Sequence, residues 1–410
     1  MHSRRDTFIA VLLPLLIGVA IVGVFVISYR FTTHNRGEER FLVYWAGMRA
    51  WLVDGDSPYS DAAASHIKEL AVRSGDPHAR VTYPLYGGFF FLPFAAIPGY
   101  ALARALWMTT LAAALLVTAL LCLRLTGGRS SVWLMALFLL LGVTGYPSVS
   151  LLISGNATIL AALFLIAALD ALRLERDTFA GALLALSTIQ PLLVVVVLPL
   201  ILLWAVSRQR WLVVTWFFGL LAVLSVIGAF FIPDWIVQWL RNLLHYSDYL
   251  APASPGAAFL NWWPGIGRQL GLLFTLLLVV SLFSEWWAAR RREFRWFVWT
   301  AGVTLIVAQW VGLPAGVENF VALLLPLATV VAVMEERGGR KTRWVIGVVL
   351  LFLYVGTWGL YFGASKGQLR AALLFLPPLA QLLLSYWVRG WAIHPQRLFA
   401  EEIRLHGEAG

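Results

Sequence analysis

Two long polar segments, residues 30–99 and 233–265, carry side chains whose types could do chemistry. Carboxylates of the first can accept a proton from a reacting hydroxyl group, among them Glu38, Glu39, Asp54 and Asp56. The second holds several aromatic residues, including Trp262 beside Asn261. Connections in compact proteins usually span about 4–6 residues, and much longer ones tend to be functional. Single carboxylates in loops more often face solvent, and single tryptophans more often anchor a chain at the bilayer interface. The functional hypothesis therefore rests on the clusters.

Other kinds of chemistry have weak support in this sequence. Gly127-Gly128 and Gly338-Gly339 are turns beside arginines, and neither belongs to a phosphate-binding loop. One cysteine, Cys122, allows no intrachain disulfide. The histidines of the two polar segments match no metal motif: His34, His66, His78 and His245. We expect no cofactor, with a divalent metal left open.

The composition predicts the kind of structure that positions these side chains. Of the 410 residues 60% are hydrophobic, enough for about twelve crossings of roughly 20 residues each. Charged residues make up 13%, about half of the roughly 25% usual in soluble domains. The apolar runs are continuous, whereas the strands of a membrane barrel alternate. These features exclude a soluble enzyme, a disordered chain and a β-barrel. They predict an all-α polytopic membrane protein, with residues 1–410 as a single integral membrane domain.

The apolar runs give the helices. They cover residues 7–29, 100–123, 131–146, 152–172, 178–206, 211–232, 266–289, 296–312, 319–334, 344–362 and 371–388. Arginines flank both ends of 178–206, so we expect two short helices there, broken at Gln190-Pro191, which brings the total to about twelve. The proline-interrupted segment 83–98 is too short to span and is expected to be interfacial or re-entrant. Phe41–Val53 has Phe41, Trp45, Met48 and Leu52 at helical spacing, which predicts an amphipathic helix on the membrane surface.

The charge pattern gives the orientation. The formal net charge is +10, and the basic residues lie in short clusters between apolar runs. Such clusters set topology and contact anionic lipid headgroups, so we expect membrane lipids and no nucleic acid as partners. The short loops with most of the arginines are assigned to the cytoplasm. Both termini and the tail 389–410 then lie inside, the first helix is retained, and 30–99 and 233–265 lie outside.

Few ionisable groups fall within the apolar runs. Asp170 and Glu285 lie near cytoplasmic ends beside Arg173 and Arg290, and they are expected to form structural pairs with arginine. Glu318 lies in a short outside loop. A transporter with a proton relay or ion pathway would carry charges near the bilayer midplane, and this pattern has essentially none.

Several short motifs then follow in order along the chain. They are Phe41–Ala50 with Asp56-Ser57-Pro58-Tyr59, Tyr83-Pro84-Leu85 with Leu92-Pro93, Ser154-Gly155-Asn156-Ala157, Gly181–Pro191, and Asn261 with Arg268. Together with the layout of a first helix, a long external loop and short broken helices, they resemble the GT-C glycosyltransferases. The closest resemblance, over roughly residues 1–330, is to glycosyltransferase family 87, whose members depend on polyprenyl-phosphate mannose.

The sequence departs from that family's pattern at three places. The aspartate before the first-loop phenylalanine is replaced by Arg40, preceded by Glu38 and Glu39. The lysine before the hairpin proline is Gln190. The late histidine-aromatic pair reads Glu318-Asn319-Phe320. The resemblance therefore supports the fold more strongly than it supports retained catalysis.

The resemblance implies an inverting transfer of a sugar, mannose in this family, from a polyprenyl-phosphate donor to a lipid or glycan acceptor on the extracytoplasmic face. Glu39 is the expected base. It lies one residue before the position of the family's aspartate, and its side chain is one methylene group longer, which offsets that shift. Glu38, Asp54 and Asp56 are the expected substitutes. The expected donor-phosphate ligands are Arg40, Arg268, Lys366 and Arg370. The expected sugar or acceptor contacts are Tyr83, Asn156, Gln190, Asn261, Trp262 and Glu318. For the four basic residues expected to bind the donor phosphate, contact with lipid headgroups is an equally good interpretation.

A second class of function stays open. The chain could be a non-catalytic membrane protein, either a degenerate transferase that acts as a scaffold or a lipid or solute transporter. A transporter would be favoured by inverted repeats and polar sites at the midplane. A cavity with a carboxylate, an arginine and an apolar groove open to lipid would favour the enzyme.

Overall fold

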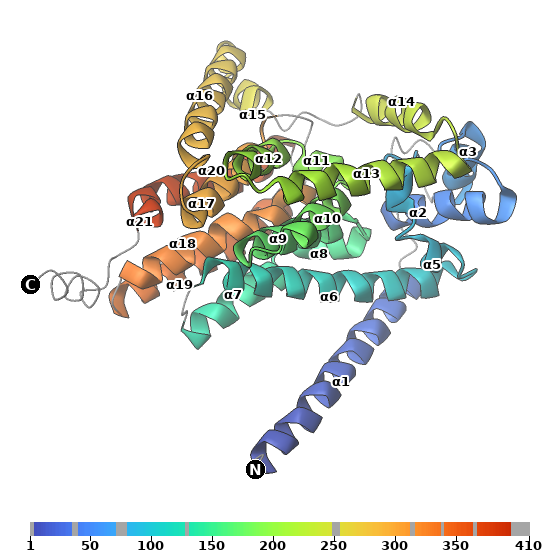
Figure 1. Ribbon diagram of the computed structural model, residues 1–410, viewed down its shortest axis with the longest axis horizontal. Coiled ribbons are helices and arrows are strands. Elements are labelled where there is room, and N and C mark those ends of the chain that lie inside the picture. The colour runs from blue at the N-terminus through green and yellow to red at the C-terminus, as the bar shows by residue number, and fades with distance from the viewer. Residues whose placement is uncertain are drawn as a thin grey trace, which may run out of the picture.

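The protein is an all-α polytopic membrane protein. The computed structural model describes residues 4–34, 40–70, 80–127, 131–247, 255–311, 316–337, 340–363 and 367–394. Within these ranges the chain forms helices and turns and no β-strand. Helix α1 packs against α6 (Figure 1).

The first half of the chain combines short helices with two long ones. Its elements are α1 (Arg4–His34), α2 (Arg40–Arg49), the π-helix η1 (Ala50–Asp54), α3 (Asp61–Leu70), α4 (Leu85–Gly88), α5 (Leu92–Ala95), α6 (Tyr100–Thr126), α7 (Val132–Thr144), α8 (Tyr146–Ser154), α9 (Thr158–Arg173), α10 (Asp177–Ser187), α11 (Pro191–Val194) and α12 (Val197–Ser207).

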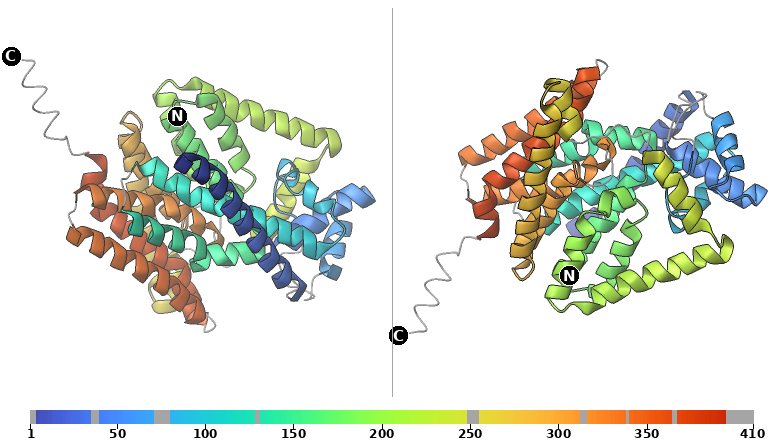
Figure 2. Two further views of the ribbon diagram at one scale, coloured as in Figure 1. Left: turned by 90° about the horizontal axis from the view of Figure 1, so that it is seen from below. Right: turned by 90° about the horizontal axis from the view of Figure 1, so that it is seen from above.

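Long helices are more frequent in the second half. Its elements are α13 (Trp211–Phe231), α14 (Trp235–Ser247), α15 (Pro255–Trp262), α16 (Gly267–Ala289), α17 (Phe294–Val307), the 3₁₀ helix η2 (Val317–Leu323), α18 (Leu324–Arg337), α19 (Arg340–Gly363), α20 (Gly367–Trp387) and α21 (Arg389–Ile393). Figure 2 shows the same helices from below and from above.

Six stretches of the described helices are long and apolar enough to cross a membrane. They are Tyr100–Thr126, Val132–Ser154, Trp211–Phe231, Gly267–Ala289, Val317–Arg337 and Lys341–Gly363. Lipid offers no hydrogen-bond partner to the backbone, so a continuous apolar run is satisfied as a helix. Shorter apolar helices fill most of the other predicted runs. How many of these shorter helices cross the membrane stays a prediction.

Proline and glycine explain the interruptions. The expected break in 178–206 is confirmed: α10 ends at Ser187, and Pro191 begins α11. The second of the two expected helices is itself interrupted, because α11 ends at Val194 and α12 begins at Val197. The expected boundary between the runs 131–146 and 152–172 was misplaced. The helix continues from α7 through a bend at Gly145 into α8 and ends at Gly155, and the next helix begins only at Thr158.

The prediction of an amphipathic surface helix over Phe41–Val53 was wrong. Helix α2 is buried on all sides, from Phe41 through Met48, because helices and loops far along the sequence surround it. The following π-helix turn exposes Leu52 and Val53. Helix α3 is the amphipathic helix of this segment, with Ala63, Ala64 and Ile67 facing inward.

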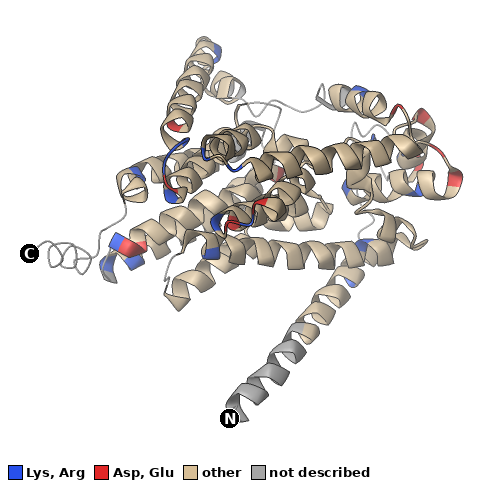
Figure 3. Ribbon diagram, in the orientation of Figure 1, with Lys and Arg blue, Asp and Glu red and all other residues tan. Residues whose placement is uncertain are grey.

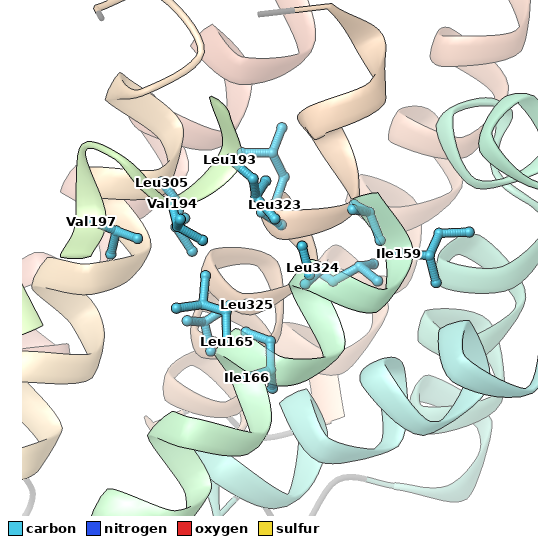
Figure 4. Packing of buried hydrophobic residues seen from close by; sticks show 14 of the residues in the cluster. Ile159, Leu165, Ile166, Leu193, Val194, Val197, Leu305, Leu323, Leu324 and Leu325 are labelled. Carbon is cyan, nitrogen blue, oxygen red and sulfur yellow. The ribbon is translucent and has the colours of Figure 1, made fainter. Parts of the chain in front are cut away.

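The core is formed where the broken helices meet the late ones. Leucine, isoleucine and valine side chains of α9 and α11 pack against α17 and η2–α18, and Figure 4 shows Leu165, Val194, Leu305 and Leu325 among them. The described part of the span Val317–Arg337 is almost entirely buried, whereas α13, α16 and α19 expose large apolar side chains. Exposed apolar side chains are expected on helices that face lipid, such as α13, α16 and α19, whereas a helix that is apolar and buried on all sides lies inside the bundle.

Charged residues gather at helix ends and in loops (Figure 3). The expected arginine partner of Asp170 is confirmed: Arg173 Nη2 lies 2.8 Å from Asp170 Oδ1. Glu285 also pairs with arginine, but its partner is Arg389, with nitrogen–oxygen distances of 2.8 and 3.0 Å, and Arg290 instead lies over the Trp287 ring.

The Glu285–Arg389 pair ties α16 to α21, so we expect Glu285→Ala to lower the Tm by roughly 2–5 °C, a loss of about 2 kcal/mol. Glu285 is only 7% exposed, and its removal leaves the guanidinium of Arg389 half-buried without a carboxylate. Thermal unfolding of the detergent-solubilised protein measures this. The control is Glu293→Ala, an exposed carboxylate that precedes α17. Equal Tm values for the two variants would contradict the assignment.

Candidate functional site

The two long polar segments pack against each other. Helix α14, in the second segment, directs one face at residues 57–83 of the first. Ser57 Oγ donates to Gln238 Oε1 at 2.6 Å, and Trp239 Nε1 donates to the carbonyl oxygen of Thr82 at 2.8 Å. The buried Asn242 amide donates to the carbonyl oxygen of Val81 at 3.2 Å. The structure thus brings together two segments that the sequence only placed on the same side.

A left-handed turn between α8 and α9 packs against the start of helix α2. Gly155 has φ +67°, and a Cβ built on it would lie 2.6 Å from the Cβ of Phe41. The Phe41 ring stacks on Trp107 of α6 with centroids 5.8 Å apart, and Trp107 Nε1 donates to the carbonyl oxygen of Gly155 at 2.8 Å. The close approach of the two backbones therefore fixes the first turn of α2.

An ion pair joins the start of α2 to η2. Arg40 Nη2 lies 3.2 Å from Glu318 Oε1, although the two residues are 278 positions apart in the sequence. Their side chains are 17% and 36% exposed, so the pair remains accessible. Helix η2 also packs on α8 and α9, beside the turn that holds α2. We call the group formed by Arg40, Glu318, Gly155 and Asn156 the junction site.

Asn156 is buried at the start of α9 and organises the turn. Its Oδ1 accepts hydrogen bonds from the Thr158 backbone nitrogen at 3.0 Å and from the Thr158 hydroxyl at 2.8 Å. The Tyr44 hydroxyl of α2 reaches the same oxygen at 3.4 Å. Asparagine oxygens favour this position because they satisfy backbone groups at a helix start. Asn156 therefore has a structural role at the edge of the junction site.

Tyr83 lies behind α2 with its ring against Tyr44, their centroids 5.2 Å apart. Its hydroxyl is buried and has no hydrogen-bond partner. Burial raises the pKa of Tyr83 well above its usual value, and the neighbouring Tyr44 adds to the rise. Burial likewise raises the pKa of Tyr86 to about 12. Both phenols stay protonated near neutral pH, so neither is suited to act as a base.

Arg104 is a buried arginine that the sequence reasoning missed. It lies in the first turns of α6 and is fully buried, with Nη2 donating to the carbonyl oxygen of Ile153 at 3.0 Å and the guanidinium 5.2 Å from the centroid of the Phe31 ring. A charged residue inside the predicted run 100–123 was the available signal, because ionisable groups in membrane helices tend to mark functional positions.

Other predicted residues lie apart from the junction site. Gln190 begins the break before α11, and the neighbouring Thr188 bonds the Tyr86 hydroxyl. Arg268 is exposed in the first turn of α16. Trp262 packs in an aromatic cluster with Phe259 and Phe375. These three residues lie outside α2 and η2, the elements that carry Arg40 and Glu318.

Several predictions lie outside the described residues. These are Glu38, Glu39 and Lys366, together with the side chains of Asn261 and Arg370. The substitutes Asp54 and Asp56 are described and exposed. In the described ranges no group of three or more His, Cys, Asp or Glu could hold a metal ion.

Comparison with known proteins identifies the family. The model of glycosyltransferase family 87 matches residues 82–314, which is more than half of the chain. The chain belongs to glycosyltransferase family 87. Searches among curated proteins and among solved structures each gave no match.

The family 87 match contains several of the motifs that carried the resemblance. Tyr83-Pro84, Ser154–Ala157, Gly181–Pro191 and Asn261 with Arg268 all fall within it. The first-loop motif Phe41–Ala50 and Glu318 fall outside. The junction site thus combines a matched segment, the Gly155-Asn156 turn, with two segments on either side of the match.

A glycosyltransferase needs a sugar donor and an acceptor, and the junction site offers two kinds of group for such a reaction. Arg40 provides a guanidinium, whose planar N–H groups suit an anionic oxygen. Glu318 provides a carboxylate at 3.2 Å from it. A cation beside a carboxylate is the pair needed when a leaving group gains negative charge while an attacking hydroxyl group loses a proton.

Proposed function

We propose that this family 87 glycosyltransferase moves a sugar, mannose, from a polyprenyl-phosphate donor to a lipid or glycan acceptor, with inversion at the sugar. The observation that carries the proposal is the Arg40–Glu318 pair, set between the first polar segment and η2 in a membrane-embedded family 87 chain. The partners are then the lipid-borne donor, the acceptor and the surrounding membrane lipids.

In the proposed reaction the acceptor oxygen attacks the anomeric carbon, and the bond between that carbon and the donor phosphate oxygen breaks. A carboxylate takes the proton of the acceptor hydroxyl group, and polyprenyl phosphate leaves with the negative charge. We keep Glu39 as the proposed base because it directly precedes Arg40 in the sequence. Glu38 remains its substitute.

Arg40 is the proposed phosphate ligand at the junction site. An arriving phosphate competes with Glu318 for the guanidinium, because charge-assisted bonds to phosphate oxygens are strong. Glu318 then turns from Arg40 to a hydroxyl group of the sugar or acceptor. Arg268, Lys366 and Arg370 are proposed to attract the donor headgroup. Tyr83, Asn156, Gln190, Asn261 and Trp262 are proposed to shape the sugar and acceptor side.

We place the site on the extracytoplasmic face, with both termini in the cytoplasm and residues 1–410 as one integral membrane domain. The packing of α14 on residues 57–83 supports a common side for the two polar segments. The clusters of arginines in the short loops support the cytoplasm as the opposite side.

The rival proposal is a non-catalytic membrane protein. A transporter pathway would place charged groups near the middle of the helices. The buried charges of the described residues lie close to helix ends instead: Arg104 near the start of α6, Asp170 near the end of α9 and Glu285 near the end of α16. A degenerate transferase remains the stronger rival. An assay of sugar transfer distinguishes it from an active enzyme.

The test is sugar transfer by the purified protein from polyprenyl-phosphate mannose to an extracted membrane lipid fraction. We expect transfer by the wild type and a decrease of about 10²–10³-fold in kcat for Glu39→Gln, because a general base typically contributes 10²–10⁴-fold. The control is Glu336→Gln, which neutralises a carboxylate paired with Arg295 at the end of α18.

Full activity of Glu39→Gln would remove Glu39 from the role of base. Absence of transfer by the wild type, together with unchanged folding, would favour the degenerate transferase.

A further inference from the structure

A recess opens between α19 and α20. Its volume is about 520 Å³. Its floor includes Gly356 and Gly359 of α19, and a Cβ added at either glycine would meet no atom within 4 Å. Phe352 and Leu360 of α19, with Leu376 and Leu383 of α20, form its walls. Binding sites for small molecules are typically about 300–1,000 Å³, so the recess is large enough for a ligand.

The lining of the recess selects an apolar ligand. Among the described residues that line it, Thr357 has the one polar side chain, and the Thr357 hydroxyl already donates to the carbonyl oxygen of Tyr354 at 3.0 Å. A polar group placed there would lose its bonds to water without gaining a partner, which is unfavourable. The recess therefore fits a hydrocarbon chain.

A smaller cavity adjoins the recess. Leu353, Thr357 and Pro377 line both the recess and this inner cavity of about 50 Å³. Phe320 of η2 also lines the inner cavity, and so does Gln381, whose Oε1 atom is buried and has no hydrogen-bond partner. Glu318 of the junction site lies in the first turn of the same helix η2. The inner cavity is thus lined both by residues of the recess and by a residue of the helix that bears the ion pair.

We infer that the recess between α19 and α20 holds the hydrocarbon chain of the lipid-phosphate donor, an assignment that rests on the proposed function. The chain lies along Gly356 and Gly359, and the phosphate end is directed to η2. A helix of a second copy is the other natural occupant of a glycine-lined surface. A helix about 10–12 Å wide would cover the recess without entering a cavity of about 50 Å³, whereas a single chain can occupy both.

The variants Gly356→Leu and Gly359→Leu fill the recess, and the open space at both positions leaves the backbone undisturbed. Gly219→Leu is the matched control, because Gly219 is exposed on α13 and its Cβ also meets nothing within 4 Å. Each protein is labelled with a polyprenyl phosphate that carries a photoreactive group in its chain, and the labelled peptides are mapped by mass spectrometry.

We expect labels on α19 and α20 in the wild type and in Gly219→Leu, and about tenfold less label there in Gly356→Leu, the effect of losing about two buried methylene groups. Unlabelled polyprenyl phosphate should remove the label, whereas excess phosphatidylcholine should not. The KM for a long-chain donor should rise about tenfold in Gly356→Leu, while the KM for a ten-carbon donor should change less than about twofold.

Other results overturn the inference. Label on other helices, equal label in the Gly356 and Gly219 variants, or removal of the label by phosphatidylcholine would each do so. An altered oligomeric state of Gly356→Leu with unchanged label would assign the recess to a second copy. Specific label in a protein that transfers no sugar would support the chain site and count against the proposed function alone.

Discussion

Arg40→Ala lowers kcat/KM for sugar transfer by about 10²–10³-fold, the loss expected when one preorganised donor to a developing charge is removed. Arg40 is proposed to hold the donor phosphate both before and during bond cleavage, so both KM and kcat should change. Glu318→Gln should mainly lower kcat, because the amide still contacts Arg40 but no longer carries the negative charge. Steady-state kinetics with the long-chain donor separates the two effects.

The control is the Arg295–Glu336 pair, which is also partly exposed: its two side chains are 31% and 35% exposed, against 17% and 36% for Arg40 and Glu318. Arg295→Ala should leave kcat/KM unchanged within about threefold, as expected for an exposed ion pair with little net energy. If Arg40 and Glu318 act together, the double variant Arg40→Ala/Glu318→Gln loses less than the product of the two single effects. Arg40→Ala with the activity of Arg295→Ala would exclude the junction site from the reaction.

Much of the fold could be predicted, because in lipid the local sequence pattern of apolar runs, prolines and glycines determines where helices form. Continuous apolar runs are satisfied as helices, and proline and glycine end them, so the break at Gln190-Pro191 followed from sequence alone. The bend at Gly145 was harder to predict. There the apolar character continues through the bend, and the end of α8 depends on the left-handed conformation of Gly155.

The error at α2 has a tertiary cause. Phe41, Trp45 and Met48 have the spacing of an amphipathic helix, but the residues between them are buried as well. Tyr83, Trp107 and Gly155, which lie up to about 110 positions away, cover the other faces of α2. Periodicity reports how apolar residues are spaced, whereas burial depends on such distant partners.

The candidate site was predictable only in part. The sequence singled out Arg40, Asn156 and Glu318, but it gave no means of bringing Arg40 to Glu318, since their contact depends on how α2 and η2 both pack on the α8–α9 turn. From the sequence, Arg40 was expected to bind the donor phosphate and Glu318 to contact the sugar or acceptor, with no contact between the two. Arg104 could have been noticed in the sequence, because it is a charged residue within a predicted apolar run. Counts of composition do not show where in the chain a charge lies.

Gly155→Ala should destabilise the protein by about 3 kcal/mol and also reduce sugar transfer. A non-glycine residue in the left-handed region costs roughly 1–2 kcal/mol, and overpacking adds about 1–3 kcal/mol. The new Cβ would lie 2.6 Å from the Cβ of Phe41, so α2 must shift. Since Arg40 directly precedes Phe41, that shift moves the guanidinium relative to Glu318.

Gly127→Ala separates the two contributions. Gly127 has the same φ of +67°, but its Cβ would meet nothing within 4 Å, so this variant retains the backbone cost and lacks the clash. We expect the Tm of Gly155→Ala to lie a few degrees below that of Gly127→Ala, and only Gly155→Ala to lose transfer activity. Equal Tm values would mean that α2 tolerates the added methyl group, and the backbone contact at Gly155 would then not be what fixes Arg40 at the junction site.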